Sequence, residues 1–71
     1  MAEDEWRKMT IAAEAAIREK NIARALEIRS ELSQVADRSP KINQYYRTFY
    51  DLVLAIHFGQ PVQIERLSAL A

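Results

Sequence analysis

Apolar residues recur at helical spacing along nearly all of this 71-residue chain, and this pattern limits its fold more than any other feature. Only one glycine and two prolines interrupt the pattern. β-Branched residues nowhere form the sustained period-two pattern of a half-buried strand. The sequence therefore predicts an all-α protein.

The first half of the chain predicts two helices, spanning about residues 2–19 and 22–36. Asn21 separates them, and asparagine suits either the end of one helix or the N-cap of the next. The first apolar face consists of Trp6, Met9, Ala13, Ala16 and Ile17. The second consists of Ile22, Ala25, Leu26, Ile28, Leu32, Val35 and Ala36.

The third predicted helix begins at Pro40 and ends near Phe58. Ser39 is a favourable N-cap, and Pro40 suits the first helical position, where its missing N–H is not needed. Gly59 fits the position after the helix end. The apolar stripe consists of Ile42, Tyr45, Tyr46, Phe49, Leu52, Val53 and Ile56. From Leu52 onward apolar residues surround most of the helix, which predicts a central, heavily buried element.

A short fourth helix can begin at Pro61, with an apolar face of Val62, Ile64, Leu67 and Leu70. The short connections bring consecutive helices back antiparallel. We therefore expect one domain over residues 1–71, a small antiparallel helical bundle of three long helices and a short fourth. It amounts to two stacked helical hairpins.

The chain also shows a weak internal repeat. At an offset of 39 residues, Ala16–Ile17 falls on Ala55–Ile56 and Lys20–Asn21 falls on Gly59–Gln60. Helical hairpins that repeat at roughly 34 to 40 residues are typical of solenoid proteins.

The stretch from Ala13 to Leu26 resembles the helical hairpin of the tetratricopeptide repeat. Ala13 and Ala25 stand where that family places small residues for close helix packing. The resemblance implies an architecture of stacked helical hairpins and transfers no binding residue. The chain departs from the family at three positions, where aromatic, aromatic and proline residues are usual: Ala16, Arg29 and Asp37.

No constellation for catalysis is apparent. The chain has no cysteine and a single histidine, His57, which we expect at the boundary of the third helix near its C-terminal dipole. It has no nucleophile elbow, phosphate loop or zinc-binding helix motif. We therefore expect a non-enzymatic protein with no catalytic residues, cofactor, metal or small-molecule substrate.

Charge and hydropathy narrow the partner classes. Ten basic residues balance ten acidic ones, so nucleic acid is a less favoured partner than protein. The longest apolar run, Leu52 to Ile56, is far short of the roughly 20 residues of a membrane span. The first residues are acidic, unlike a signal peptide. These features predict a cytoplasmic protein without a membrane partner.

Arg29 is the most unusual residue, because it lies within the apolar stripe of the second helix, between Leu26 and Leu32. A buried guanidinium without a partner is costly. We favour an edge position, with the aliphatic stem packed and the head in water. An ion pair within the chain or an interface with a partner remains the alternative.

Leu54 and Phe58 lie one turn apart on the otherwise polar side of the third helix. Two large apolar residues there need a cover. We expect the fourth helix to fold across them, with another chain as the alternative.

The leading hypothesis is a protein-interaction module, such as a small adaptor, co-chaperone or assembly factor, that holds a partner helix or self-associates. Tyrosines on the third helix suit an interface because they bury area and keep one polar end. Ile11 is a further surplus apolar position, together with Leu54, Phe58 and Ile28. The candidate partner-binding residues are Arg29, Leu54, Phe58, Tyr46, Tyr50 and Ile28.

The alternative is a small nucleic-acid-binding regulator that uses the third helix. Aromatic and basic residues interleave there, as in proteins that stack on nucleotides. The candidate readers are Lys41, Asn43, Gln44 and Arg47. Salt dependence separates the two classes, because phosphate binding weakens steeply as salt rises.

Overall fold

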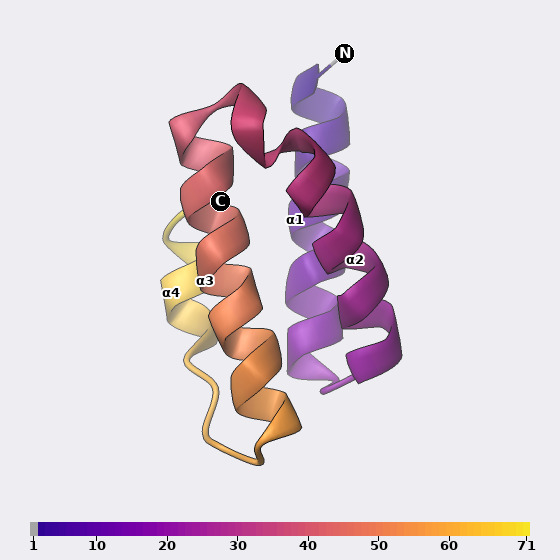
Figure 1. The fold of residues 1–71 in the computed structure, drawn as a ribbon, viewed down its shortest axis with the longest axis vertical. Coiled ribbons are helices and arrows are strands. Elements are labelled where there is room, and N and C mark those ends of the chain that lie inside the picture. The colour runs from indigo at the N-terminus through magenta and orange to yellow at the C-terminus, as the bar shows by residue number, and fades with distance from the viewer. Residues whose placement is uncertain (1) are drawn as a thin grey trace.

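The computed structural model describes residues 2–71 and is all-α (Figure 1). Its elements are α1 (Ala2–Arg18), α2 (Ile22–Val35), a 3₁₀ turn η1 (Ala36–Arg38), α3 (Pro40–His57) and α4 (Ile64–Ser68). This confirms three long helices and a short fourth within the described residues. The fourth helix is shorter than expected, because it begins at Ile64 rather than at Pro61.

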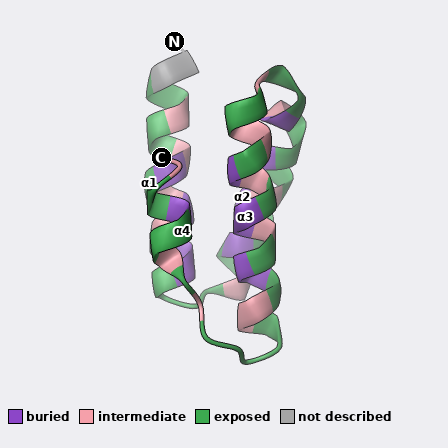
Figure 2. Cartoon of the chain, turned by 90° about the vertical axis from the view of Figure 1, so that its left-hand side faces the viewer, coloured by how far each residue is buried: buried purple, intermediate pink, exposed green. Residues whose placement is uncertain are grey.

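The helices form two layers. Figures 1 and 2 show α2 and α3 side by side in one layer, with α1 and α4 in the other. Helix α3 contacts all the other elements, and its contact with α2 is the most extensive in the molecule. The α1–α2 hairpin therefore stacks on the α3–α4 hairpin, as the sequence predicts.

Helix α1 ends in a Schellman motif. The Asn21 N–H donates to the Ala16 carbonyl at 3.0 Å, and the Lys20 N–H donates to the Ile17 carbonyl at 3.1 Å. This geometry requires a left-handed residue, and Lys20 supplies it with a φ of 53°. The Asn21 side chain then accepts from the Arg24 N–H at 3.2 Å, so α2 begins at once.

Helix α3 ends in the same motif, one repeat later. The Gln60 N–H donates to the Ala55 carbonyl at 2.7 Å, and the Gly59 N–H donates to the Ile56 carbonyl at 3.1 Å. Gly59 is the left-handed residue here, with a φ of 70°. The 39-residue offset in the sequence thus corresponds to two equal helix endings. The connections that follow these two helix endings differ in length. Helix α2 begins directly after Asn21, whereas four residues separate Gly59 from α4.

The core lies between the two layers. Helices α1 and α2 approach each other through small side chains, with Ala13, Ala16 and Ala25 buried. The larger side chains that fill the remaining space come from all four α-helices: Ile17, Ile28, Leu32, Tyr45, Phe49, Leu52, Val53 and Leu67.

Tyr45 is the polar centre of this core. Its ring meets Trp6 edge-on, with 4.9 Å between centroids, and its hydroxyl donates to the Thr10 carbonyl at 3.4 Å. Burial raises the pKa of Tyr45 well above its usual range, and the Glu14 carboxylate adds to the rise. The hydroxyl therefore stays protonated and ties α3 to α1.

Within residues 2–71, no helix combines the length and the hydropathy that a membrane crossing requires.

Truncation of Phe49 tests the core. Phe49 is fully buried, so we expect Phe49→Ala to lower the free energy of unfolding by about 3–5 kcal/mol, measured by urea denaturation. Because this loss can unfold a small domain, Phe49→Leu provides a milder second variant. Ile11→Ala is the control, since Ile11 is exposed and we expect a change below about 0.5 kcal/mol. A Phe49→Ala protein as stable as its parent would contradict this core.

The two helix endings give a matched pair of tests. A left-handed residue other than glycine costs about 1–2 kcal/mol. We therefore expect Lys20→Gly to stabilise the protein by up to about 1 kcal/mol, and Gly59→Ala to destabilise it by about 1 kcal/mol. A Cβ added at Gly59 has no neighbour within 4 Å, so the loss there reports backbone strain alone. Urea unfolding of both variants measures the two effects, and equal signs would contradict the assignment.

Candidate partner-binding face

One line of large side chains runs along the outer side of α3. Tyr46, Tyr50, Leu54 and Phe58 follow one another four residues apart, so they lie on successive turns. The two tyrosines are partly buried, with 6.5 Å between ring centroids. Leu54 is 37% exposed and Phe58 is 69% exposed. Apolar surface therefore increases toward the C-terminal end of the helix.

Helix α2 supplies the other side of a groove. Leu26 and Arg29 face the α3 line across a hollow of about 240 Å³. The hollow is lined by Ile22, Leu26, Arg29, Tyr50, Val53, Leu54 and His57. We call this surface the α2–α3 face, comprising the hollow together with Tyr46 and Phe58. It lies on the layer nearest the viewer in Figure 1.

The fourth helix does not cover this face, contrary to the sequence-based expectation. Helix α4 packs between α1 and α3, in the other layer (Figure 2). Leu67 is buried there, while Val62, Ile64 and Leu70 pack partly against the core. The residues that α4 was expected to cover, Leu54 and Phe58, stay exposed because its apolar side is used against α1 and α3.

Arg29 is partly buried and stacks on an aromatic ring. Its Cζ lies 4.3 Å from the centroid of the Tyr50 ring, which is a cation–π contact. Its Nε is buried without a hydrogen-bond partner, and an unsatisfied buried donor costs about 1–3 kcal/mol. No ion pair involves Arg29 within the described part of the chain. The described residues therefore supply no intramolecular ion pair to Arg29, and its side chain lines the groove.

Two apolar residues singled out from the sequence lie elsewhere. Ile28 is only 1% exposed and belongs to the core, so its side chain is not available to a partner. It is buried because it occupies the inner side of α2, next to Ala25 and Leu32. Ile11 is 64% exposed but belongs to α1, in the other layer.

Leu26 belongs to the face, although the sequence placed it in the core stripe of the second helix. It is 46% exposed. Too many apolar residues fall on that helix for all to be buried at once. Arg29, one turn further along, is the sequence signal that this edge of the stripe reaches the surface.

His57 lies at the C-terminal end of α3, at the boundary that the sequence indicates. Its side chain is exposed and meets the Phe58 ring edge-on, with 5.1 Å between centroids. It also lines the groove, so it contributes a polar rim to the face rather than a buried polar centre.

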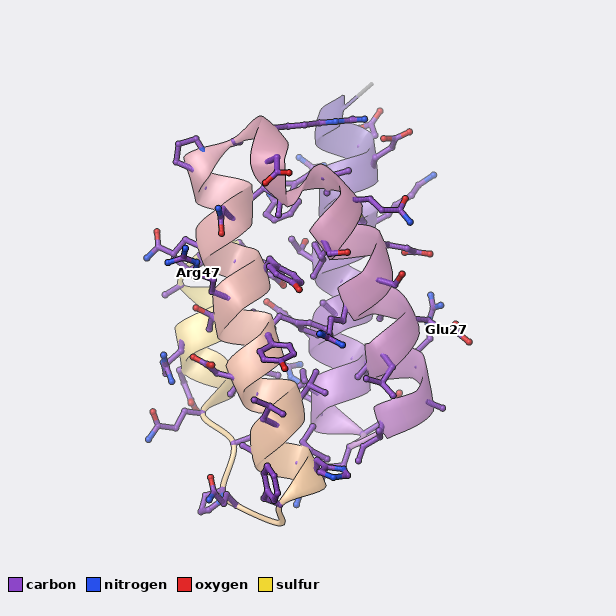
Figure 3. All side chains as sticks on the ribbon, viewed as in Figure 1. Glu27 and Arg47 are labelled. Carbon is purple, nitrogen blue, oxygen red and sulfur yellow. The ribbon has the colours of Figure 1, made fainter. Side chains whose placement is uncertain are left out.

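The candidate nucleic-acid readers line two different hollows. Asn43, Gln44 and Arg47 line a shallow hollow with Pro40, whereas Lys41 lines a different one near Trp6. Figure 3 shows Arg47 pointing away from α2, on the outer edge of α3. These residues therefore lie apart from the α2–α3 face.

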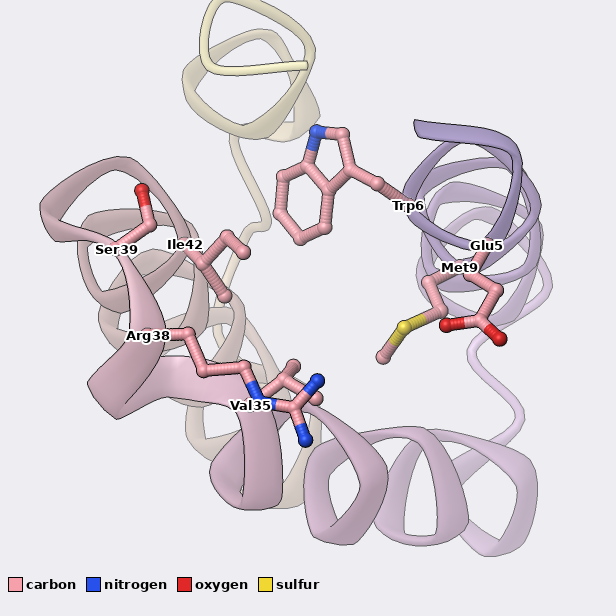
Figure 4. A pocket seen from close by; sticks show the side chains of 7 residues that line it. All are labelled: Glu5, Trp6, Met9, Val35, Arg38, Ser39 and Ile42. Carbon is pink, nitrogen blue, oxygen red and sulfur yellow. The ribbon is translucent and has the colours of Figure 1, made fainter. Parts of the chain in front are cut away.

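A second apolar hollow, of about 270 Å³, opens between the start of α1 and the η1–α3 turn (Figure 4). Trp6, Met9, Val35 and Ile42 form its apolar lining, and Glu5, Arg38 and Ser39 add polar groups. It contains none of the candidate partner-binding residues. Among residues 4–71, whose side chains the structure describes, no three His, Asp or Glu side chains come together as metal ligands.

Substitution of Arg29 tests its environment in the free chain. We expect Arg29→Ala to lower the free energy of unfolding by no more than about 1 kcal/mol, because the loss of the ring contact and packed stem is partly offset by removal of the unsatisfied Nε. Arg29→Met keeps the stem, so its loss is expected to be smaller. Arg24→Met is the control, since Arg24 forms an exposed pair with Glu27 at 3.0 Å. A loss of 3 kcal/mol or more would instead indicate a broken buried ion pair.

No protein-family model, curated protein or solved structure matches this chain. The likeness to the tetratricopeptide repeat therefore stays a prediction from the residues.

Proposed function

We propose that this chain is a non-catalytic protein-interaction module that binds a helix of a partner protein across the α2–α3 face. Such a role fits a small adaptor, co-chaperone or assembly factor. The observation that carries the proposal is the line of Tyr46, Tyr50, Leu54 and Phe58 beside an open apolar groove.

The composition of the face supports a protein partner. Clustered apolar side chains with a polar rim are typical of interaction sites, whereas single exposed apolar residues are ordinary. Tyrosine and arginine are the residues most often found at the energetic centre of interfaces, and Arg29 and Tyr50 contact each other here. A groove between two antiparallel neighbouring helices accepts an amphipathic helix through residues at i, i+3, i+4 and i+7.

Affinity capture from the native host with matched variants tests this function. We expect the wild-type chain and Ile11→Ser to retain the same protein, and Leu54→Ser to lose it. Leu54 and Ile11 are both exposed leucine-like side chains on different layers, so the pair separates the α2–α3 face from general stickiness. Truncation of a central contact is expected to weaken binding by about 2 kcal/mol or more, roughly 30-fold.

Amide hydrogen exchange of the captured complex locates the contact. Added protection is expected along Leu26–Arg29 and Tyr50–Phe58. Capture that is equal for Leu54→Ser and Ile11→Ser, or protection confined to α1 and α4, would contradict the proposal. A bound nucleic acid whose affinity falls steeply with salt would favour the alternative, a regulator that reads through Asn43, Gln44 and Arg47.

A further inference from the structure

The α2–α3 groove carries positive charge without any acid of its own. Among the described residues that line it, Arg29 is the only strong base and none is Asp or Glu. The other titratable groups that line it are Tyr50, whose ring contacts Arg29, and His57. A partner that buries this surface therefore meets one guanidinium surrounded by apolar side chains.

The acids of α2 lie outside the groove. The Glu27 carboxylate accepts from Arg24, and Figure 3 shows its side chain on the outer edge of the molecule. Glu31 lines a different hollow, against Lys8 and Met9 of α1. On α3, Asp51 lies 4.0 Å from Arg66 of α4. None of these three carboxylates is paired with Arg29.

The guanidinium rests against one aromatic ring. Its Cζ lies 4.3 Å from the centroid of the Tyr50 ring, and its buried Nε has no hydrogen-bond partner. Arginine presents a planar fork of N–H donors that matches a carboxylate. A rigid fork loses less conformational freedom on binding than a mobile side chain does.

A second copy of this chain suits the groove poorly. A symmetric dimer places the same surface on both sides of the interface. Two α2–α3 faces would contribute two Arg29 side chains and, among their lining residues, no carboxylate. Covering a charge without an opposite charge is costly. Charge complementarity therefore favours a different chain that brings an acid.

We propose that the partner helix carries an Asp or Glu within its apolar face, and that this carboxylate binds the Arg29 guanidinium. The inference rests on the proposed function, since it names the chemistry of the helix that the face accepts. Leu26 lies one turn from Arg29 and Leu54 lines the same groove. In the partner helix, large apolar side chains therefore flank the acid at a distance of one helical turn.

Selection from a displayed library tests this without knowledge of the partner. The probe is a library of helix-forming peptides of about 16 residues with random side chains along one face. We expect peptides selected on the wild-type chain to carry Asp or Glu at one position between apolar residues. Selection on Arg29→Met, checked by circular dichroism to be folded, is expected to lose that preference. Arg24→Met is the matched control and is expected to keep it.

One selected peptide is then synthesised with its acid and with the corresponding amide. The acid is expected to bind the wild-type chain about tenfold more tightly than the amide, and to show no such advantage on Arg29→Met. Isothermal titration measures the four affinities. Weaker binding of both peptides to Leu54→Ser, but not to Ile11→Ser, places them on the face.

The contrary outcomes are distinct. Peptides that bind the face without an acid, or an acid preference that survives Arg29→Met, overturn this inference and leave the proposed function standing. Selected peptides whose binding is unchanged by Leu54→Ser overturn both. A second copy of the chain is the remaining candidate occupant, and sedimentation equilibrium tests it. A dimer that Leu54→Ser dissociates would make the second copy the partner and would overturn the proposed Arg29–carboxylate pair.

Discussion

The structure depends on the apolar surface of α3, against which every other element packs. Tyr45 and Phe49 are fully buried at its centre, where the Trp6 ring of α1 meets Tyr45 edge-on. A chain of this length has little apolar area to spare, so a single helix that serves all its neighbours is an economical way to build a core. The Tyr45 hydroxyl adds a hydrogen bond to this apolar packing. It donates to the Thr10 carbonyl and so joins α3 to α1.

The position at which α4 packs determines which surface of the protein stays exposed. Five residues of helix are enough to bury Leu67 between α1 and α3, but not to reach the α2–α3 side as well. The line from Tyr46 to Phe58 is therefore left without a cover from this chain. The face is a consequence of the fold rather than of an unusual composition, since the apolar fraction of 49% is ordinary for a globular domain.

Arg29 shows how one polar group can give such a face selectivity. An apolar groove alone accepts many amphipathic helices with little discrimination. A guanidinium in the groove, stacked on the Tyr50 ring, penalises a partner that covers its charge with apolar groups alone. The same group tolerates solvent in the free chain, because the aliphatic stem packs in the groove while the charge is only partly buried.

The sequence by itself determined the class and nearly all the local structure. Helical spacing, the Ser39–Pro40 start and the Gly59 stop are local signals, so they fixed the first three helices to within about a residue. The hairpins followed from the short connections. Only the tertiary structure decided that Ile28 is buried while Leu26 is exposed, and that α4 packs away from Leu54. Both outcomes depend on which neighbour reaches each side of a helix, and periodicity carries no information about that choice.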